Sequence, residues 1–207
     1  MSLTNAIPNS QLCSRFEQPE IWDIDLMSNA FYGEKFRLMR AMIPAGIRSV
    51  TDIGCRNAVQ TNALATTYQV VGADRSLEAL KRAGARGGRT QVVCCSAESL
   101  PFPNQSFDLV FSSQLLEHLP SGALQKAIGE MKRVARSWIL LSAPFRENLR
   151  AQWSYCNRCR RPFHIYGHLQ RFDLRRLRGL LRGWELCWVH CGEHGLITIP
   201  GCSESGS

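Results

Sequence analysis

Three residues near the ends of two strand-like segments carry the first chemical signal in this chain. Asp52 and Gly54 lie in the run VTDIGC, and Asp74 follows the apolar run VVGA. Asp74 comes 22 residues after Asp52, close to the roughly 20-residue gap between a glycine turn and the ribose-binding carboxylate of nucleotide-binding folds. A glycine lets a ligand approach the backbone closely, and a carboxylate can accept hydrogen bonds from both ribose hydroxyls. The spacing therefore indicates a ligand that contains a ribose.

A second group of residues, with metal-binding chemistry, lies at 155–172 in the segment YCNRCRRPFHIYGHLQRF. It contains a CxxC pair and two histidines separated by three residues. Two thiolates and two imidazoles suit a tetrahedral structural zinc ion. We therefore expect zinc ligands at Cys156, Cys159, His164 and His168.

The spacing within this segment leaves the ligand set open. Only four residues separate Cys159 from His164, fewer than in a zinc finger, so the loop must fold back if all four side chains are to converge. Cys191 or His194 is an alternative fourth ligand. The alternative without a metal is a chance CxxC in a chain with nine cysteines, with the histidines packed in an aromatic loop.

Length and composition favour one folded domain without a membrane span. A chain of 207 residues is long enough for a single α/β domain with a full core. No apolar run approaches the roughly 20 residues that a membrane-spanning helix needs, and the start, MSLTNAIPNSQLC, lacks the features of a signal peptide. We therefore expect a cytoplasmic protein, and its odd number of cysteines argues against a disulfide framework.

The positive charge of the chain is concentrated in one region. Ten arginines lie between Arg146 and Arg182, against two acidic residues, and this local balance of +8 equals the formal charge of the whole protein. Such a basic surface attracts anionic partners such as phosphates, sugar nucleotides, nucleic acids or lipid headgroups. A solvated face without a partner is the alternative interpretation of the same charge.

Strand-like and helix-like patterns alternate along the chain. The helical patterns lie at 30–43, 59–67, 76–83, 121–135 and 173–183, with Ser76 and Asp173 as N-caps. The strand patterns lie at 49–53, 69–73, 91–95, 107–112 and 137–142, before a closing hairpin at 185–190 and 196–200. This alternation predicts an α/β fold with a mostly parallel sheet and helices on both faces. We expect an N-terminal arm over 1–28, one domain over 29–207 and a Cys/His-rich basic insert at 145–170.

Four motifs in succession resemble one known family. They are VTDIGC at 50–55, VVGADRS at 70–76, SAESLPFPNQSFDLVFSS at 96–113 and LLEHL at 115–119. Over residues 30 to 145 the chain resembles a class I S-adenosylmethionine-dependent methyltransferase of the small-molecule, type 11 branch. The resemblance implies a Rossmann-like, seven-stranded sheet with an antiparallel strand near the C-terminus, and S-adenosylmethionine as cofactor. It also implies transfer of a methyl group to a small or carrier-bound acceptor, for which oxygen is the preferred atom.

The resemblance implies a cofactor site along the ends of the first four strands. Its expected residues are Asp52, Gly54, Cys55, Arg56, Asp74, Arg75, Ala97, Glu98, Ser113 and Gln114. Gly54 would meet the methionine part, Asp74 the ribose, and the turn with Ala97 and Glu98 the adenine. The chain departs from the family in the glycine loop, where Arg56 stands at the second glycine and Ala58 at the third.

The sequence identifies no catalytic residue, although His118 in LLEHL is the candidate for a general base. Two alternatives to a small-molecule methyltransferase stay open. In the first, Arg56 blocks the cofactor and the protein is a non-catalytic binding module. In the second, the basic insert holds the phosphates of a nucleic acid that is methylated, although no RNA-binding module is recognisable in the sequence. The oligomeric state is not predicted.

Overall fold

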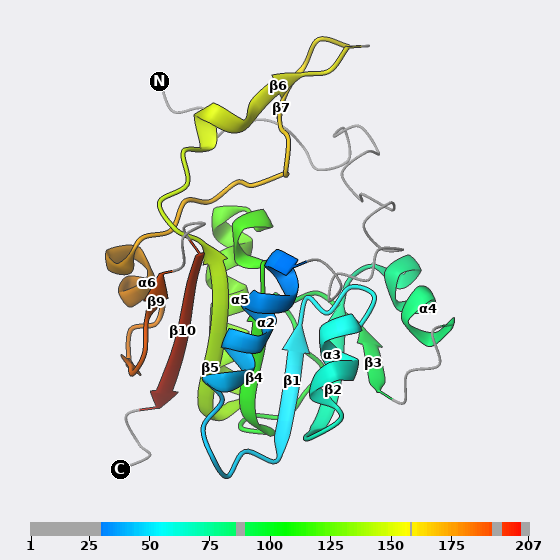
Figure 1. The fold of residues 1–207 in the computed structure, drawn as a ribbon, viewed down its shortest axis with the longest axis vertical. Helices are drawn as coiled ribbons and strands as arrows, with labels where there is room; N and C mark the ends of the chain where they lie inside the picture. Colours follow the sequence, from blue (N-terminus) through cyan, green and yellow to red (C-terminus); the bar gives the residue numbers. More distant parts are fainter. Residues whose placement is uncertain (1–29, 86–89, 158, 192–195, 204–207) are drawn as a thin grey trace.

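The computed structural model describes residues 30–85, 90–157, 159–191 and 196–203 (Figure 1). The expected N-terminal arm at 1–28 lies outside these residues. So do His194, one of the alternative zinc ligands, and the expected hairpin turn between Gly192 and Gly195.

Five parallel strands form the part of the sheet that positions the candidate site. In spatial order they are β3 (Gln91–Cys94), β2 (Gln69–Asp74), β1 (Ser49–Ile53), β4 (Phe107–Ser113) and β5 (Ala135–Pro144). The strand order reverses between β1 and β4, and the carboxyl ends of all five strands meet at the same edge. The prediction of a Rossmann-like, mostly parallel α/β fold is confirmed.

The C-terminal strands extend the sheet beyond β5. Strand β10 (Leu196–Ser203) pairs antiparallel with β5, and both β8 (Trp184–Leu186) and β9 (His190–Cys191) pair antiparallel with β10. The sheet therefore has eight strands rather than the expected seven. The difference arises because the single strand expected at 185–190 is two short strands that pair with different parts of β10.

Helices cover both faces of the sheet, and two separate cores result. Helices α2 (Ala30–Ala41) and α3 (Val59–Leu64) contribute to one core, and α5 (Ser121–Val134) and α6 (Leu174–Leu180) contribute to the other. Strand β4 contributes side chains to both cores, because successive side chains of a strand point to opposite faces. Leu109 and Phe111 lie in the first core, and Val110 lies in the second. In Figure 1, α2 and α5 lie on opposite sides of the sheet.

Both predicted helix caps are confirmed. The Ser76 hydroxyl accepts a hydrogen bond from the Ala79 N–H at 3.2 Å, before helix α4 (Leu77–Ala85). An Asp173 carboxylate oxygen accepts one from the Arg176 N–H at 2.8 Å, before α6. Each cap satisfies a backbone donor that the first turn of a helix leaves free.

The insert after β5 projects beyond the carboxyl edge of the sheet (Figure 1). It contains a short 3-10 helix, η4 (Leu149–Gln152), and a two-stranded antiparallel hairpin of β6 (Trp153–Tyr155) and β7 (Pro162–His164). Its chain returns through Phe172, which forms an isolated bridge with Phe145. None of the helices in the described part of the chain has the length and apolar character needed to cross a membrane.

Candidate active site

The loop after β1 is built on the left-handed conformation of Gly54. Gly54 has φ +84, and its N–H and that of Cys55 donate to the Ala73 carbonyl at 2.8 and 3.1 Å. A Cβ at Gly54 would lie 3.1 Å from the Leu115 side chain, closer than nine in ten real Cβ contacts. The backbone angle and the Leu115 side chain therefore both favour glycine at this position. These reasons are independent of the ligand that the sequence predicts here.

Asp74 joins this loop to the end of β2. One of its carboxylate oxygens accepts the Arg56 N–H at 2.8 Å, and the other accepts the Ser76 N–H at 2.8 Å. A carboxylate offers about four lone-pair sites, so each oxygen keeps the capacity to accept another hydrogen bond. Asp74 is partly exposed and therefore suits the ribose-binding role that the sequence predicts for it.

Asp52 and Cys55 lie beneath the loop and do not line its open side. Asp52 is 2 % exposed and accepts a hydrogen bond from the Thr61 hydroxyl at 2.7 Å. Burial raises the pKa of Asp52 to about 7 and raises the pKa of the Cys55 thiol well above its usual value. A Cβ at Gly72 would lie 2.9 Å from the Cys55 sulfur, which shows how tightly the thiol is packed. The sequence predicts that both residues contact the cofactor. In the structure their side chains are buried and support the loop from below.

Arg56 adopts the left-handed conformation with φ +49 that a glycine would take at this position. Its backbone N–H binds Asp74, while its guanidinium charge acts on a separate group of titratable side chains. Burial raises the pKa of Glu117 to about 7 and lowers the pKa values of His118 and Lys35; the Arg56 charge is a smaller effect that opposes the rise at Glu117 and adds to the lowering at the other two.

Gln114 places an unused hydrogen-bond donor at the end of β4. Its backbone has φ +56 and its N–H donates to the Ser142 carbonyl at 3.0 Å. Its side-chain nitrogen is buried and has no hydrogen-bond partner among the described residues. An orphaned donor of this kind suits a ligand carboxylate or hydroxyl. The neighbouring Ser113 hydroxyl accepts from Ser142 at 3.2 Å.

The remaining predicted cofactor residues lie along the same edge. Arg75 is exposed, and its carbonyl accepts a weak hydrogen bond from the Cys94 thiol at 3.7 Å. Ala97 packs partly against the core, while Glu98 is exposed and donates its N–H to the Ser96 hydroxyl at 3.2 Å. The contact of this turn with adenine stays a prediction.

A cluster of histidines and glutamates lies where the insert meets the 3-10 helix η3 (Leu116–His118). It contains Glu117 and His118 from η3, and Glu147, His164 and His168 from the insert. Nδ1 of His168 lies 2.6 Å from a Glu147 oxygen, and the rings of His118 and His168 meet edge to face with centroids 4.9 Å apart. The sequence indicated His118, His164 and His168 separately but gave no reason to join them to Glu117 and Glu147.

The predicted Cys2His2 zinc site does not form in this structure. The only groups of three or more metal-binding side chains found among the described residues contain neither Cys156 nor Cys159. The hairpin register explains the separation: Trp153 pairs with His164 at the base and Tyr155 pairs with Pro162 near the tip, where the CxxC turn follows. His164 is thus two strand residues, roughly 7 Å, away from that turn, and it is buried while Cys159 is exposed.

The comparisons with known proteins agree with this geometry. Residues 51–138 match the family model of a methyltransferase domain. No curated protein matches the chain significantly. Three solved S-adenosylmethionine-dependent methyltransferases share the fold. One is from Thermotoga maritima (18 % identity, 92 % of this chain and 97 % of that chain, TM-score 0.68). The others are from Methanosarcina mazei and Mesorhizobium loti. Each is 17 % identical to this chain, the match covers 80 % of this chain and 96 % of that chain, and the TM-score is 0.64.

The family match runs from β1 to the first residues of β5 and includes the strand ends that carry Gly54, Asp74 and Gln114. Residues 51–138 therefore resemble a methyltransferase domain, and the chain has the fold of solved S-adenosylmethionine-dependent methyltransferases.

Proposed function

We propose that this protein transfers a methyl group from S-adenosylmethionine to a small or carrier-bound acceptor that bears an anionic group, with oxygen as the preferred acceptor atom. The observation that carries the proposal is the arrangement at one sheet edge of the Asp74 carboxylate and the unpartnered Gln114 amide. The Asp74 carboxylate suits ribose hydroxyls, and the Gln114 amide nitrogen suits a carboxylate or hydroxyl of the ligand. The site that they frame lies in the matched domain, at the point where the strand order reverses.

The chemistry needs orientation more than activation. S-adenosylmethionine supplies an already activated methyl group on its sulfonium. Asp74 would hold the ribose, and the Gln114 amide would donate a hydrogen bond to the methionine end. The insert covers this edge, so it would exclude water and align the acceptor.

A hydroxyl acceptor would also need a group to receive its proton. His118 fits this role poorly, because burial, helped by His168 and Arg56, lowers its pKa to about 3. No residue is therefore assigned as the proton acceptor.

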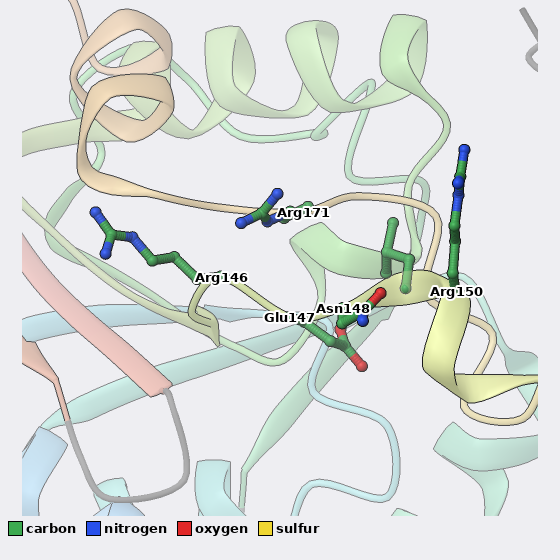
Figure 2. Close-up of a pocket in the computed structure, with 6 residues that line it drawn as sticks. Arg146, Glu147, Asn148, Arg150 and Arg171 are labelled. Carbon is green, nitrogen blue, oxygen red and sulfur yellow. The ribbon is translucent and has the colours of Figure 1, made fainter.

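A basic cavity at the start of the insert supports an anionic acceptor (Figure 2). It measures about 450 Å³ and lies just past the carboxyl end of β5. Its lining consists of three arginines and three other residues: Arg146, Glu147, Asn148, Leu149, Arg150 and Arg171. Arginine is the side chain best suited to bind carboxylates and phosphates with two parallel hydrogen bonds.

The first experiment is calorimetric titration of the purified protein with S-adenosylhomocysteine. We expect micromolar binding by the parent protein and similar binding by Arg56→Gly, because the Arg56 side chain acts toward Glu117 while its backbone holds Asp74. Binding by Arg56→Gly alone would instead support the non-catalytic alternative, in which Arg56 obstructs the cofactor. Absence of binding in both folded proteins would refute the proposed function.

The second test concerns the acceptor. Once a methyl-accepting anionic compound has been found by transfer of labelled methyl groups, Arg171→Ala should raise its KM about 10-fold, since a charge-assisted hydrogen bond contributes roughly 1.5 kcal/mol or more. S-adenosylhomocysteine affinity should not change. Arg178→Ala is the matched control, because Arg178 is exposed on α6 and does not line the cavity. Equal KM values for the two variants would show that the cavity does not bind the acceptor, and a steep loss of activity with salt would favour a nucleic acid.

A further inference from the structure

Three side chains from two separate segments converge in the His/Glu cluster. Glu117 and His118 come from η3, and His168 comes from the turn that follows β7. Their ligand atoms all lie within 4.8 Å of one another. Small side-chain rotations would bring each atom to the roughly 2.0–2.2 Å at which nitrogen and oxygen ligands bind zinc. We propose that Glu117, His118 and His168 bind one divalent transition-metal ion, for which zinc is the best chemical match.

Both imidazoles have the outer partner that a metal-binding histidine needs. His168 Nδ1 lies 2.6 Å from a carboxylate oxygen of Glu147, and the His118 ring is hydrogen-bonded to the Gly167 backbone. A metal-bound histidine usually donates its second ring N–H to a carboxylate or a backbone carbonyl, which fixes its tautomer and its orientation. With one nitrogen of each ring engaged in this way, the other nitrogen keeps a lone pair that can bind an ion.

Glu117 is the independent observation that points to a ligand. Its side chain is completely buried, and neither carboxylate oxygen forms a hydrogen bond with another residue among those described; only its own backbone acts on the carboxyl group at close range. A buried carboxyl group without a partner is unfavourable whether it is charged or neutral. Lys35 and Arg56 act on it electrostatically, but neither forms an ion pair with it among the described contacts. A metal ion between Glu117 and the two imidazoles would supply the missing partner.

The backbone also holds the two halves of this site together. The Glu117 carbonyl accepts the Leu169 N–H at 2.7 Å and the Gln170 N–H at 3.1 Å. Because Leu169 follows His168 directly, these bonds fix the position of His168 relative to η3. The site is therefore preorganised by the main chain, as a precise metal site requires.

His164 does not belong to the proposed ligand set. Its Nδ1 accepts the Tyr166 N–H at 3.3 Å and the His168 N–H at 3.2 Å. In the neutral ring the proton is then on Nε2, which lies 3.8 Å from Glu147. His164 thus stabilises the turn that carries His168, and its protonated nitrogen cannot bind an ion.

Three protein ligands leave a position open on the ion. Structural zinc sites fill four positions with protein ligands, whereas catalytic sites, such as those with two histidines and a glutamate, keep one for water or substrate. The ion would lie where the insert meets the edge of the sheet and could bind an oxygen of the acceptor as a Lewis acid. This role rests on the proposed function, but the binding of the ion does not.

The test is metal binding by the full chain. Protein stripped with a chelator and dialysed is titrated with Co²⁺ and with Zn²⁺, and bound metal is measured by atomic spectroscopy. We expect one ion per chain, visible d–d absorption from bound Co²⁺, and no thiolate-to-cobalt charge-transfer band. Less than one ion per chain at a Zn²⁺ concentration that saturates ordinary zinc sites, or a thiolate band, would overturn the proposal.

Variants assign the ligands. His118→Ala and His168→Ala should each lose at least 100-fold in Co²⁺ affinity, and Glu147→Ala should lose roughly 10- to 100-fold because it only orients His168. The double variant Cys156→Ser with Cys159→Ser is the control and should bind Co²⁺ like the parent. Loss of binding in this control, with retention in His118→Ala, would assign the metal to the cysteines instead. If a histidine variant does not fold, the spectrum of the parent still decides between thiolate and nitrogen ligands.

Two separate readouts distinguish failure of this proposal from failure of the proposed function. Metal content is measured without cofactor, and S-adenosylhomocysteine binding is measured on metal-free protein. Cofactor binding without metal binding would refute only the metal site. Metal binding without cofactor binding would refute only the methyltransferase proposal.

Discussion

Replacing Asp74 with alanine should weaken the binding of S-adenosylhomocysteine by at least about 100-fold. The carboxylate is expected to accept hydrogen bonds from the ribose, and each hydrogen bond to a charged group contributes roughly 1.5–3 kcal/mol. Asp74 also fixes the loop after β1 and the start of α4 through the Arg56 and Ser76 N–H groups, each at 2.8 Å. The variant therefore loses direct contacts with the ligand and the preorganisation of the loop. Calorimetric titration of the parent and the variant measures the difference.

Asp108 provides a matched control for this prediction. Its carboxylate also accepts two backbone N–H groups, those of Arg48 and Ser49 at 3.0 and 2.9 Å. It lies near the start of β4, however, and therefore at the opposite edge of the sheet from the candidate site. Asp108→Ala should reduce stability through the same loss of backbone partners and leave cofactor affinity unchanged. Equal losses of affinity in both variants would mean that Asp74 acts only through the fold.

The elements that carry the candidate cofactor site could be predicted from the sequence because their signals are local. Strand β1 has the predicted bounds, Ser49–Ile53, and β2 ends one residue later than predicted, at Asp74. Each is an apolar run that ends in a polar or glycine turn, so neighbouring residues alone determine it. Asp74 was identified for the same reason, since its place after β2 follows from the pattern of that strand.

The His/Glu cluster could not be predicted, because contacts between distant segments create it. Glu117 and Leu169 are joined by a backbone hydrogen bond across about 50 residues of sequence. Similarly, the CxxC spacing indicates a turn but not the hairpin register that places His164 at the base and the thiols at the tip. Glu147 stands alone between arginines in the sequence, and only the fold brings it to His168. Local spacing drew attention to His164 and His168 but could not show that Glu117 and Glu147 lie beside them.

Asp52 should make the protein less stable as the pH rises from about 4 to about 7. Burial raises the pKa of its carboxyl in the folded state to about 7, from 3.8. Between these values the native state binds more protons than the unfolded state, so the free energy of unfolding falls with increasing pH. Below pH 3.8 the carboxyl is protonated in both the folded and the unfolded state, and above about pH 7 the cost of burying its charge no longer changes with pH. Since one pKa unit corresponds to about 1.4 kcal/mol, the full effect amounts to a few kcal/mol.

The comparison of the parent with Asp52→Asn isolates this effect, because asparagine keeps the shape and an oxygen that can accept the Thr61 hydroxyl. Other buried groups also titrate: Glu117, with a raised pKa, acts in the same direction, and His118, with a lowered pKa, acts in the opposite one. Both contribute equally to parent and variant, so they cancel in the difference. Urea unfolding between pH 4 and pH 8 should therefore show a gap in stability that grows in favour of Asp52→Asn and levels off above pH 7. Parallel pH profiles for the two proteins would show that Asp52 ionises in the folded state at its ordinary pKa and that burial does not disfavour its charge.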